Sequence, residues 1–226
     1  MTNQMYVYGD SLLKATVPDE RFHYHFHIAE MMKEYVNQGI DIVNRAKMGA
    51  TIRKGKSLVE HDLGRGMDAK YALVAYGGND CDYKWREVAE NPDGNHHSNT
   101  ELPEFVETLR QTTNELQKKG VQPILMTLPP IDADKYFDFI CRDGLDRECI
   151  LSWLGDRQMI YRYQELYSDT VAEFAMGNDL PLVPARRELL MDRGYKDLIS
   201  ADGIHLTLSG YHRFYDTLAG WLKKNL

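Results

Sequence analysis

Cysteine is scarce in this sequence. The three cysteines, Cys81, Cys141 and Cys149, are odd in number and do not show the spacing of metal ligands. A disulfide framework needs paired cysteines and an oxidising compartment, so the sequence argues against a disulfide-stapled secreted domain and favours a reducing compartment.

Long hydrophobic runs and a leader segment are also lacking. The longest apolar run, Tyr71 to Tyr76, is far shorter than the roughly 20 residues that a membrane-spanning helix requires. The first residues, Met1 to Gln4, show no basic segment followed by an apolar one. We therefore expect no membrane span, no secretory signal and a cytoplasmic protein.

Positive charge is in deficit. The chain has 27 lysine and arginine residues against 34 aspartate and glutamate residues, which gives a net charge of −7. Such a balance repels polyphosphate, so a nucleic-acid partner is not expected.

Apolar material, in contrast, is sufficient for one packed domain. The chain has 226 residues, of which 43% are hydrophobic and 11% aromatic. A chain of this size buries roughly 70% of its unfolded surface, enough for a core without disulfide or metal staples. We expect residues 1–226 to form a single domain, since no repeat, low-complexity tract or linker divides them.

Short β-type runs alternate with long helical stretches along the chain. The predicted strands are Met5 to Tyr8, Ile40 to Val43, Tyr71 to Tyr76, Pro123 to Thr127 and Leu180 to Val183. Apolar residues at helical spacing mark 105–116 and 160–174, and a last helix is predicted after Thr207, a good N-cap. This alternation predicts an α/β fold with a parallel sheet covered by helices on both faces.

Two insertions follow strands of the predicted sheet, at about 81–100 and 131–155. Both leave from the carboxyl ends of strands, where open α/β sheets bind their ligands, so we expect them to shape a pocket. The aromatic set Tyr136, Phe137, Phe139 and Trp153 in the second insertion is expected to form its core first. A lid over the substrate and a contact in a homo-oligomer are the other roles open to it.

Two segments at opposite ends of the chain carry groups suited to nucleophilic catalysis. Ser11 comes just past the first strand, at the ligand edge of the sheet. The segment before the last helix holds Asp202 and His205 in one short loop. Asp202 can accept the Nδ1 proton of His205, which leaves Nε2 free to act as general base toward a serine hydroxyl.

Two further strand ends offer hydrogen-bond donors for an oxyanion. Gly49 follows the second strand and can bring its backbone N–H close to a substrate, because it has no Cβ. Asn79, in the segment Gly77-Gly78-Asn79-Asp80 after the third strand, can offer an uncharged side-chain amide.

These four blocks, Gly9-Asp10-Ser11-Leu12, Gly49, Gly77 to Asp80 and Asp202 to His205, resemble the SGNH hydrolase superfamily, also called GDSL esterases and lipases. The resemblance covers nearly the whole chain. It implies a three-layer α/β/α sandwich of flavodoxin type with a five-stranded parallel sheet in the order 2-1-3-4-5. It also implies a triad of Ser11, His205 and Asp202 and no metal or other cofactor.

By this resemblance, the N–H groups of Ser11 and Gly49 and the amide of Asn79 form the oxyanion hole. Asp10, beside the nucleophile, is expected to support the turn that positions Ser11. The second glycine of the Gly-x-Ser-x-Gly elbow is absent, because Leu13 occupies its place, which sets the α/β-hydrolase fold aside.

Two other patterns imitate binding motifs. The segment from Gly49 to Ser57 ends like a phosphate loop, but five residues separate its glycines where that motif allows four. The histidine-rich run His23 to His27 suggests a metal site, yet on a helix only His23 and His27 would share a face. Neither nucleotide nor metal binding is predicted.

The sequence therefore predicts a serine esterase acting on a small, short-chain ester, such as an acetylated carbohydrate. Acyl transfer, lysophospholipase or thioesterase activity at the same site remain alternatives, because they use the same triad. A non-catalytic protein of this fold that binds a small molecule is the alternative from another class.

Overall fold

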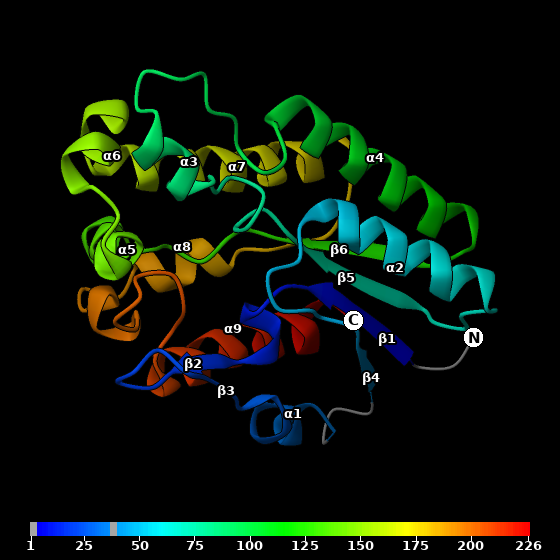
Figure 1. The fold of residues 1–226 in the computed structure, drawn as a ribbon. Helices are drawn as coiled ribbons and strands as arrows, with labels where there is room; N and C mark the ends of the chain where they lie inside the picture. Colours follow the sequence, from blue (N-terminus) through cyan, green and yellow to red (C-terminus); the bar gives the residue numbers. More distant parts are fainter. Residues whose placement is uncertain (1–3, 37–39) are drawn as a thin grey trace.

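Five parallel strands form the centre of the molecule, in the order β4-β1-β5-β6-β7 (Figure 1). A computed structural model describes residues 4–36 and 40–226; Met1 to Asn3, considered above for a leader, lie outside this part. The strands are β1 (Gln4–Gly9), β4 (Asp41–Asn44), β5 (Tyr71–Ala75), β6 (Gln122–Met126) and β7 (Leu182–Val183). Along the chain this is the order 2-1-3-4-5, so the predicted sheet is confirmed.

The largest boundary difference lies at β7. It begins at Leu182, two residues later than the sequence suggested. Pro181 has no N–H to donate to a sheet, and its carbonyl instead accepts the N–H of Leu125 at 2.9 Å.

Helices cover both faces of the sheet, as the α/β/α prediction requires. One face carries α1 (Ile28–Val36), α8 (Ala185–Leu190) and α9 (Leu208–Asn225). The other carries α2 (Ile52–Gly64), α4 (Leu102–Lys118) and α7 (Gln158–Gly177). In Figure 1, α2 and α4 lie above the sheet and α1 and α9 below it.

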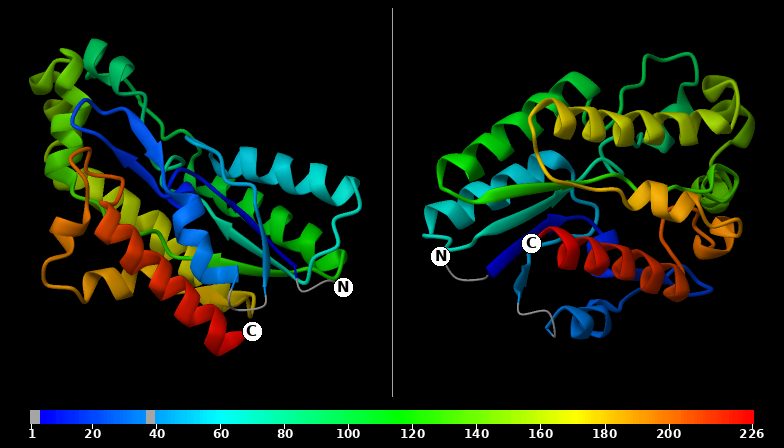
Figure 2. Two further views of the ribbon diagram at one scale, coloured as in Figure 1. Left: turned by 90° about the horizontal axis from the view of Figure 1, so that it is seen from below. Right: turned by 180° about the vertical axis from the view of Figure 1, so that it is seen from behind.

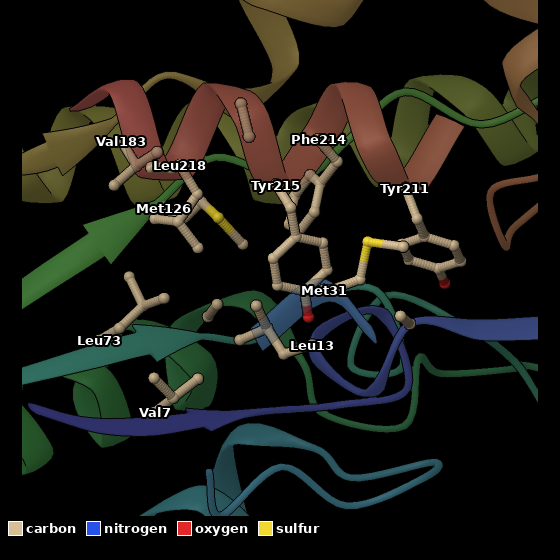
Figure 3. Close-up of a cluster of buried hydrophobic side chains, with 14 of the residues drawn as sticks. Val7, Leu13, Met31, Leu73, Met126, Val183, Tyr211, Phe214, Tyr215 and Leu218 are labelled. Carbon is tan, nitrogen blue, oxygen red and sulfur yellow. The ribbon is translucent and has the colours of Figure 1, made fainter. Parts of the chain in front are cut away.

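The last helix shows how the apolar spacing produces this packing. The buried side chains of α9 include Tyr211, Phe214, Tyr215 and Leu218, which lie on one stripe and pack onto strand residues such as Val7 (Figure 3). Thr207 caps the helix as predicted, since its hydroxyl accepts the N–H of Gly210 at 3.2 Å.

The two insertions pack on each other at one end of the molecule, on the left in Figure 1. The first contains α3 (Trp85–Glu90), and the second contains α5 (Ala133–Ile140) and α6 (Arg147–Leu154). Their shared apolar cluster holds Tyr136 and Phe137 in its buried part, with Phe139 and Trp153 packed against it. The aromatic set therefore lies in the core of the insertions.

A short antiparallel hairpin, β2 (Thr16–Pro18) and β3 (Tyr24–Phe26), was not predicted. The helix considered for the run His23 to His27 is therefore wrong, because Tyr24–Phe26 forms a β-strand. Nδ1 of His23 and Nε2 of His25 lie 3.3 and 3.5 Å from Oδ2 of Asp19. The described residues contain no group of three or more side chains that could hold a metal ion. Seen from below, the hairpin reaches the same end of the molecule as the insertions (Figure 2).

The segment that imitates a phosphate loop leads into α2. The N–H of Ile52, at the start of this helix, donates to both carboxylate oxygens of Asp80 at 3.0 and 3.1 Å. Lys56 forms an ion pair with Glu60 one turn further on. A carboxylate thus already occupies the position where a phosphate would sit.

None of the helices in residues 4–36 and 40–226 combines the length and the apolar character needed to cross a bilayer.

Candidate active site

Ser11 lies where the chain turns sharply after β1. It precedes a single 3-10 turn, Leu12–Lys14, so its side chain stands at the carboxyl edge of the sheet. Its Oγ lies 2.8 Å from Nε2 of His205, which is 194 residues away in the sequence. Both residues are buried, with 7% and 4% of their surface exposed.

His205 is oriented from behind by Asp202. Its Nδ1 lies 2.6 Å from Oδ2 of Asp202, which is fully buried. With Nδ1–H donating to this carboxylate, Nε2 is left as the acceptor for the Ser11 hydroxyl. The predicted Ser11, His205 and Asp202 are therefore brought into one hydrogen-bonded chain.

The loop also donates three hydrogen bonds to the other carboxylate oxygen of Asp202. Oδ1 accepts the hydroxyl of Ser200 at 2.7 Å and the N–H groups of Ile204 and His205 at 3.1 and 3.0 Å. Burial alone would raise the pKa of Asp202, but the His205 hydrogen bond and charge, together with these donors, hold it below its usual range. Asp202 is thereby kept ionised and fixed toward His205.

Gly203 ties this loop to the second insertion. Its φ of +79° lies in the left-handed region, and a Cβ there would come within 2.3 Å of the backbone nitrogen of Tyr136. Its carbonyl accepts the N–H of Asp132 at 2.9 Å. Glycine is needed at this position because the loop presses directly on the backbone of α5.

Tyr24 of the hairpin covers the imidazole. Its ring centroid lies 5.1 Å from that of His205, and its hydroxyl lies within the electrostatic influence of Asp202. Burial, with the nearby Asp202 charge, raises the pKa of Tyr24 to about 12, so it stays a donor. Sequence reasoning missed Tyr24, since nothing in a three-residue strand indicates which loop it will touch.

Asn79 and Asp10 form a second pair beside Ser11. The Asn79 amide donates to Oδ2 of Asp10 and to the carbonyl of Ala50, both at 3.2 Å. Oδ1 of Asp10 accepts the N–H of Leu12 at 2.9 Å, which fixes the turn that carries Ser11. Burial raises the pKa of Asp10 to about 6, against the effect of that N–H.

Gly49 is the predicted site residue that the structure leaves apart. It lies in an exposed turn after β4 with a φ of +67°, and it is not among the residues that line the cavity at Ser11. Its neighbour Ala50 accepts the Asn79 amide, so Gly49 is one residue away from this network.

The Ser11 hydroxyl opens into a cavity of about 70 Å³. We call its wall at Asp10, Ser11, Asn79 and His205 the catalytic end. We call its wall at Asp82, Tyr83, Trp85, Tyr136 and Tyr163 the aromatic end. Apolar side chains such as Leu128, Ile131 and Leu154 complete the lining.

Asp82 is held in place by its neighbours at the aromatic end. One of its carboxylate oxygens accepts Nε1–H of Trp85 at 2.9 Å, and the other accepts the hydroxyl of Tyr136 at 2.7 Å. Burial raises the pKa of Asp82, and the Tyr136 hydrogen bond opposes that rise. Sequence reasoning did not single out Asp82, because its position beside the Asn79 motif does not indicate that it faces the cavity.

This arrangement has the parts that acyl transfer needs: a hydroxyl in contact with a base, a carboxylate behind the base, and an amide donor beside the hydroxyl. The profile described as the GDSL-like lipase/acylhydrolase family matches residues 7–213 of the sequence. The chain belongs to this family. The resemblance drawn from the four sequence blocks is confirmed, and this GDSL-like acylhydrolase is a carboxylic ester hydrolase.

Relatives of this GDSL-like acylhydrolase include an isoamyl acetate-hydrolysing esterase of Saccharomyces cerevisiae. The two are 23% identical over 192 residues, which cover 84% of this chain and 71% of the yeast protein. A lipase/acylhydrolase of Enterococcus faecalis has a similar structure, with a TM-score of 0.64 at 18% identity over 100% of this chain and 97% of that one. A catalytic mutant of an acetylxylan esterase of Geobacillus stearothermophilus gives 0.65 at 18% identity over 97% and 93%. These two structures share the fold.

Proposed function

We propose that this protein hydrolyses small esters with a short acyl chain through Ser11, His205 and Asp202. The observation that carries the proposal is the continuous hydrogen-bonded chain from Asp202 through His205 to Ser11, which ends at the cavity. His205 Nε2 would take the proton of Ser11 while Oγ attacks the ester carbonyl. It would then give this proton to the departing alcohol.

In the second half of the reaction, water replaces the alcohol. His205 accepts a proton from the water, which attacks the acyl-Ser11 ester, and the carboxylic acid leaves as Ser11 regains its proton. We assign the oxyanion to the N–H of Ser11 and the amide of Asn79, which would turn one N–H from the Ala50 carbonyl to the substrate oxygen, with the N–H of Gly49 as a third donor. This third assignment comes from the family resemblance, and Gly49 lies one residue from the Ala50 carbonyl that accepts the Asn79 amide. Asp10 would hold both the Ser11 turn and the Asn79 amide.

The size of the cavity favours a short acyl group. At the roughly 10 to 15 Å³ that one enclosed water needs, a cavity of about 70 Å³ holds about five to seven waters, which suits an acetyl group better than a long acyl chain. The yeast relative is named for an acetate ester, and one structural neighbour is an acetylxylan esterase. Acetate esters, including acetylated carbohydrates, are therefore the first substrates to test.

The free thiols of Cys81, Cys141 and Cys149 support the expectation of a reducing, cytoplasmic location. Self-association through the insertions remains a proposal. It would use Phe139 and Trp153, since Tyr136 and Phe137 are buried in the insertion cluster.

The decisive experiment is covalent labelling of the nucleophile. The intact protein is exposed to a fluorophosphonate, its mass is measured, and the adduct is mapped by peptide. We expect one adduct on Ser11, none on Ser11→Ala, and slow labelling of His205→Ala. Ser57→Ala, which alters an exposed serine on α2, is the matched control and should label like the parent.

A chain-length series of acetate, butyrate and octanoate esters then follows, with and without an alcohol acceptor. Preference for acetate supports the proposal, and preference for octanoate contradicts the short-chain part. A transacylated product would assign the enzyme to acyl transfer. A folded protein without a Ser11 adduct would contradict catalysis and leave the binding-protein alternative.

A further inference from the structure

The described wall of the cavity carries acidic side chains without lysine or arginine partners. Within residues 4–36 and 40–226, the cavity wall contains two carboxylates, Asp10 and Asp82, and neither lysine nor arginine. A small, mostly apolar cavity strengthens the interaction of any charge placed in it. The wall therefore disfavours an anionic group, such as a phosphate on the alcohol, and favours a positive one.

Asp82 provides a carboxyl group in a fixed position. Its two oxygens each accept one hydrogen bond, from Trp85 and from Tyr136, and a carboxylate can accept more than one bond at each oxygen. None of the described lysine, arginine or histidine side chains forms an ion pair with it. The carboxylate is thus held in place while part of its accepting capacity stays open.

The two aromatic residues that hold this carboxylate, Trp85 and Tyr136, belong to a group of rings that pack at steep angles to one another. The ring centroids of Tyr83 and Trp85 lie 5.6 Å apart at 59°, and those of Tyr83 and Tyr163 lie 5.6 Å apart at 62°. Those of Trp85 and Tyr136 lie 6.4 Å apart at 77°. Rings from α3, α5 and α7 therefore form an edge-to-face cluster on the cavity wall, and aromatic ring faces attract cations.

We propose that the aromatic end binds a positively charged alkylammonium group on the alcohol part of the ester. The carboxylate and the rings both stabilise such a group, whereas a neutral hydroxyl would gain from the carboxylate alone. The ester carbonyl would then lie at Ser11, with the acyl group and the oxyanion at the catalytic end. This inference rests on the proposed ester hydrolysis and names its substrate class.

The first test compares two esters of the same shape. Acetylcholine and its uncharged isostere, in which carbon replaces the quaternary nitrogen, are hydrolysed by the parent enzyme. Each kcat/KM is divided by the ester's own alkaline hydrolysis rate, which removes the difference in intrinsic reactivity. We expect the cationic ester to be preferred at least about tenfold. A corrected ratio near one, or a preference for neutral, hydroxyl-rich glyceryl monoacetate over both esters, would overturn the inference.

Two matched pairs of variants locate the effect. Asp82→Asn should reduce the preference to within about threefold, whereas Asp93→Asn, which removes an exposed charge from the same insertion, should keep it. Tyr163→Leu should lower it several-fold, and Tyr163→Phe, which keeps the ring, should retain it. A preference that survives both Asp82→Asn and Tyr163→Leu would place the cation elsewhere and contradict the proposal.

A binding measurement separates this inference from the proposed function. Choline should inhibit hydrolysis of a neutral nitrophenyl acetate competitively, and more weakly in Asp82→Asn. Hydrolysis of the neutral ester without inhibition by choline would overturn the ammonium site and leave the esterase intact. Failure to hydrolyse any ester, with no label on Ser11, would instead remove the proposed function itself.

Discussion

The catalytic end and the aromatic end of the cavity face the same small space, but they are held in different ways. At the catalytic end, hydrogen bonds join segments that lie far apart in the chain, such as Ser11 with His205 and Asp10 with Asn79. At the aromatic end, side chains of the insertions and α7 position one another through ring contacts around Asp82.

This difference separates two tasks. Hydrogen bonds fix atoms to within a few tenths of an ångström, as bond making requires, whereas rings supply area and a diffuse attraction that suits recognition. Substitutions at the catalytic end should therefore change the hydrolysis rates of all esters by the same factor. Changes at the aromatic end should alter the ratio between esters.

The largest expected effect is at Asp202. Asp202→Asn leaves the loop but lets the side chain donate to His205, which favours the wrong tautomer, so kcat should fall by about 10⁴-fold. Steady-state hydrolysis of the cationic ester and its isostere measures this. The fall should be equal for both esters, and a fall in one alone would break the distinction between the two ends.

Asn79 comes next. Asn79→Ala removes one oxyanion donor and should lower kcat by about 10² to 10³-fold with little change in KM. The same two esters report it, and thermal melting checks the fold. An effect confined to KM would take Asn79 out of the oxyanion role and make it a binding residue.

Asp80, the buried residue that follows Asn79, allows a test of how much buried charge next to the catalytic end lowers the stability of the fold. Burial raises its pKa from 3.8 to about 6, so the native state keeps this proton to a higher pH than the unfolded state. The contribution of Asp80 to stability therefore falls as pH rises from 3.8 to 6, by at most about 3 kcal/mol.

Asp80→Asn keeps an acceptor for the N–H of Ile52 and lacks this titration. Relative to the parent, its free energy of unfolding should rise between pH 4 and pH 7, by up to about 3 kcal/mol, in urea denaturation. Asp93→Asn, at an exposed acid, should show no such rise. An Asp80→Asn curve parallel to the parent would mean that burial of Asp80 carries no such cost.

The smallest effect is expected at Tyr24. Tyr24→Phe keeps the ring on His205 but removes the polar hydroxyl near the Asp202 charge, so kcat should fall about three- to tenfold. Because Tyr24 acts through Asp202, the loss should appear in kcat for both esters alike. A change in their ratio would show that the hairpin also contacts the alcohol.

The catalytic end could be predicted from sequence because its residues follow strands. The carboxyl ends of parallel strands meet at one edge, so Ser11 and Asn79 had to come together once β1 and β5 were recognised. Asp202 and His205 were predictable because both lie in one loop before a well-capped helix.

The aromatic end could not be predicted in the same way. Tyr83 and Tyr163 meet through the packing of an insertion against α7, and such contacts leave no periodic trace in the sequence. The β2–β3 hairpin was missed for a related reason, since strands of three residues are too short to show alternation. Gly49 shows what the sequence could not tell about the catalytic end. Its position in the motif was clear, but the motif did not indicate that Gly49 lies outside the cavity wall.

Under the proposed mechanism, the long separation between Ser11 and His205 also governs when the enzyme becomes active. The nucleophile follows the first strand and the base precedes the last helix, 194 residues later. Neither half of the chain can carry out the reaction alone, and contacts between distant segments are the slow ones to form. We therefore expect a nascent chain to be catalytically silent until α9 has docked on the sheet. During refolding, the return of hydrolysis would mark completion of the whole fold rather than of any single part.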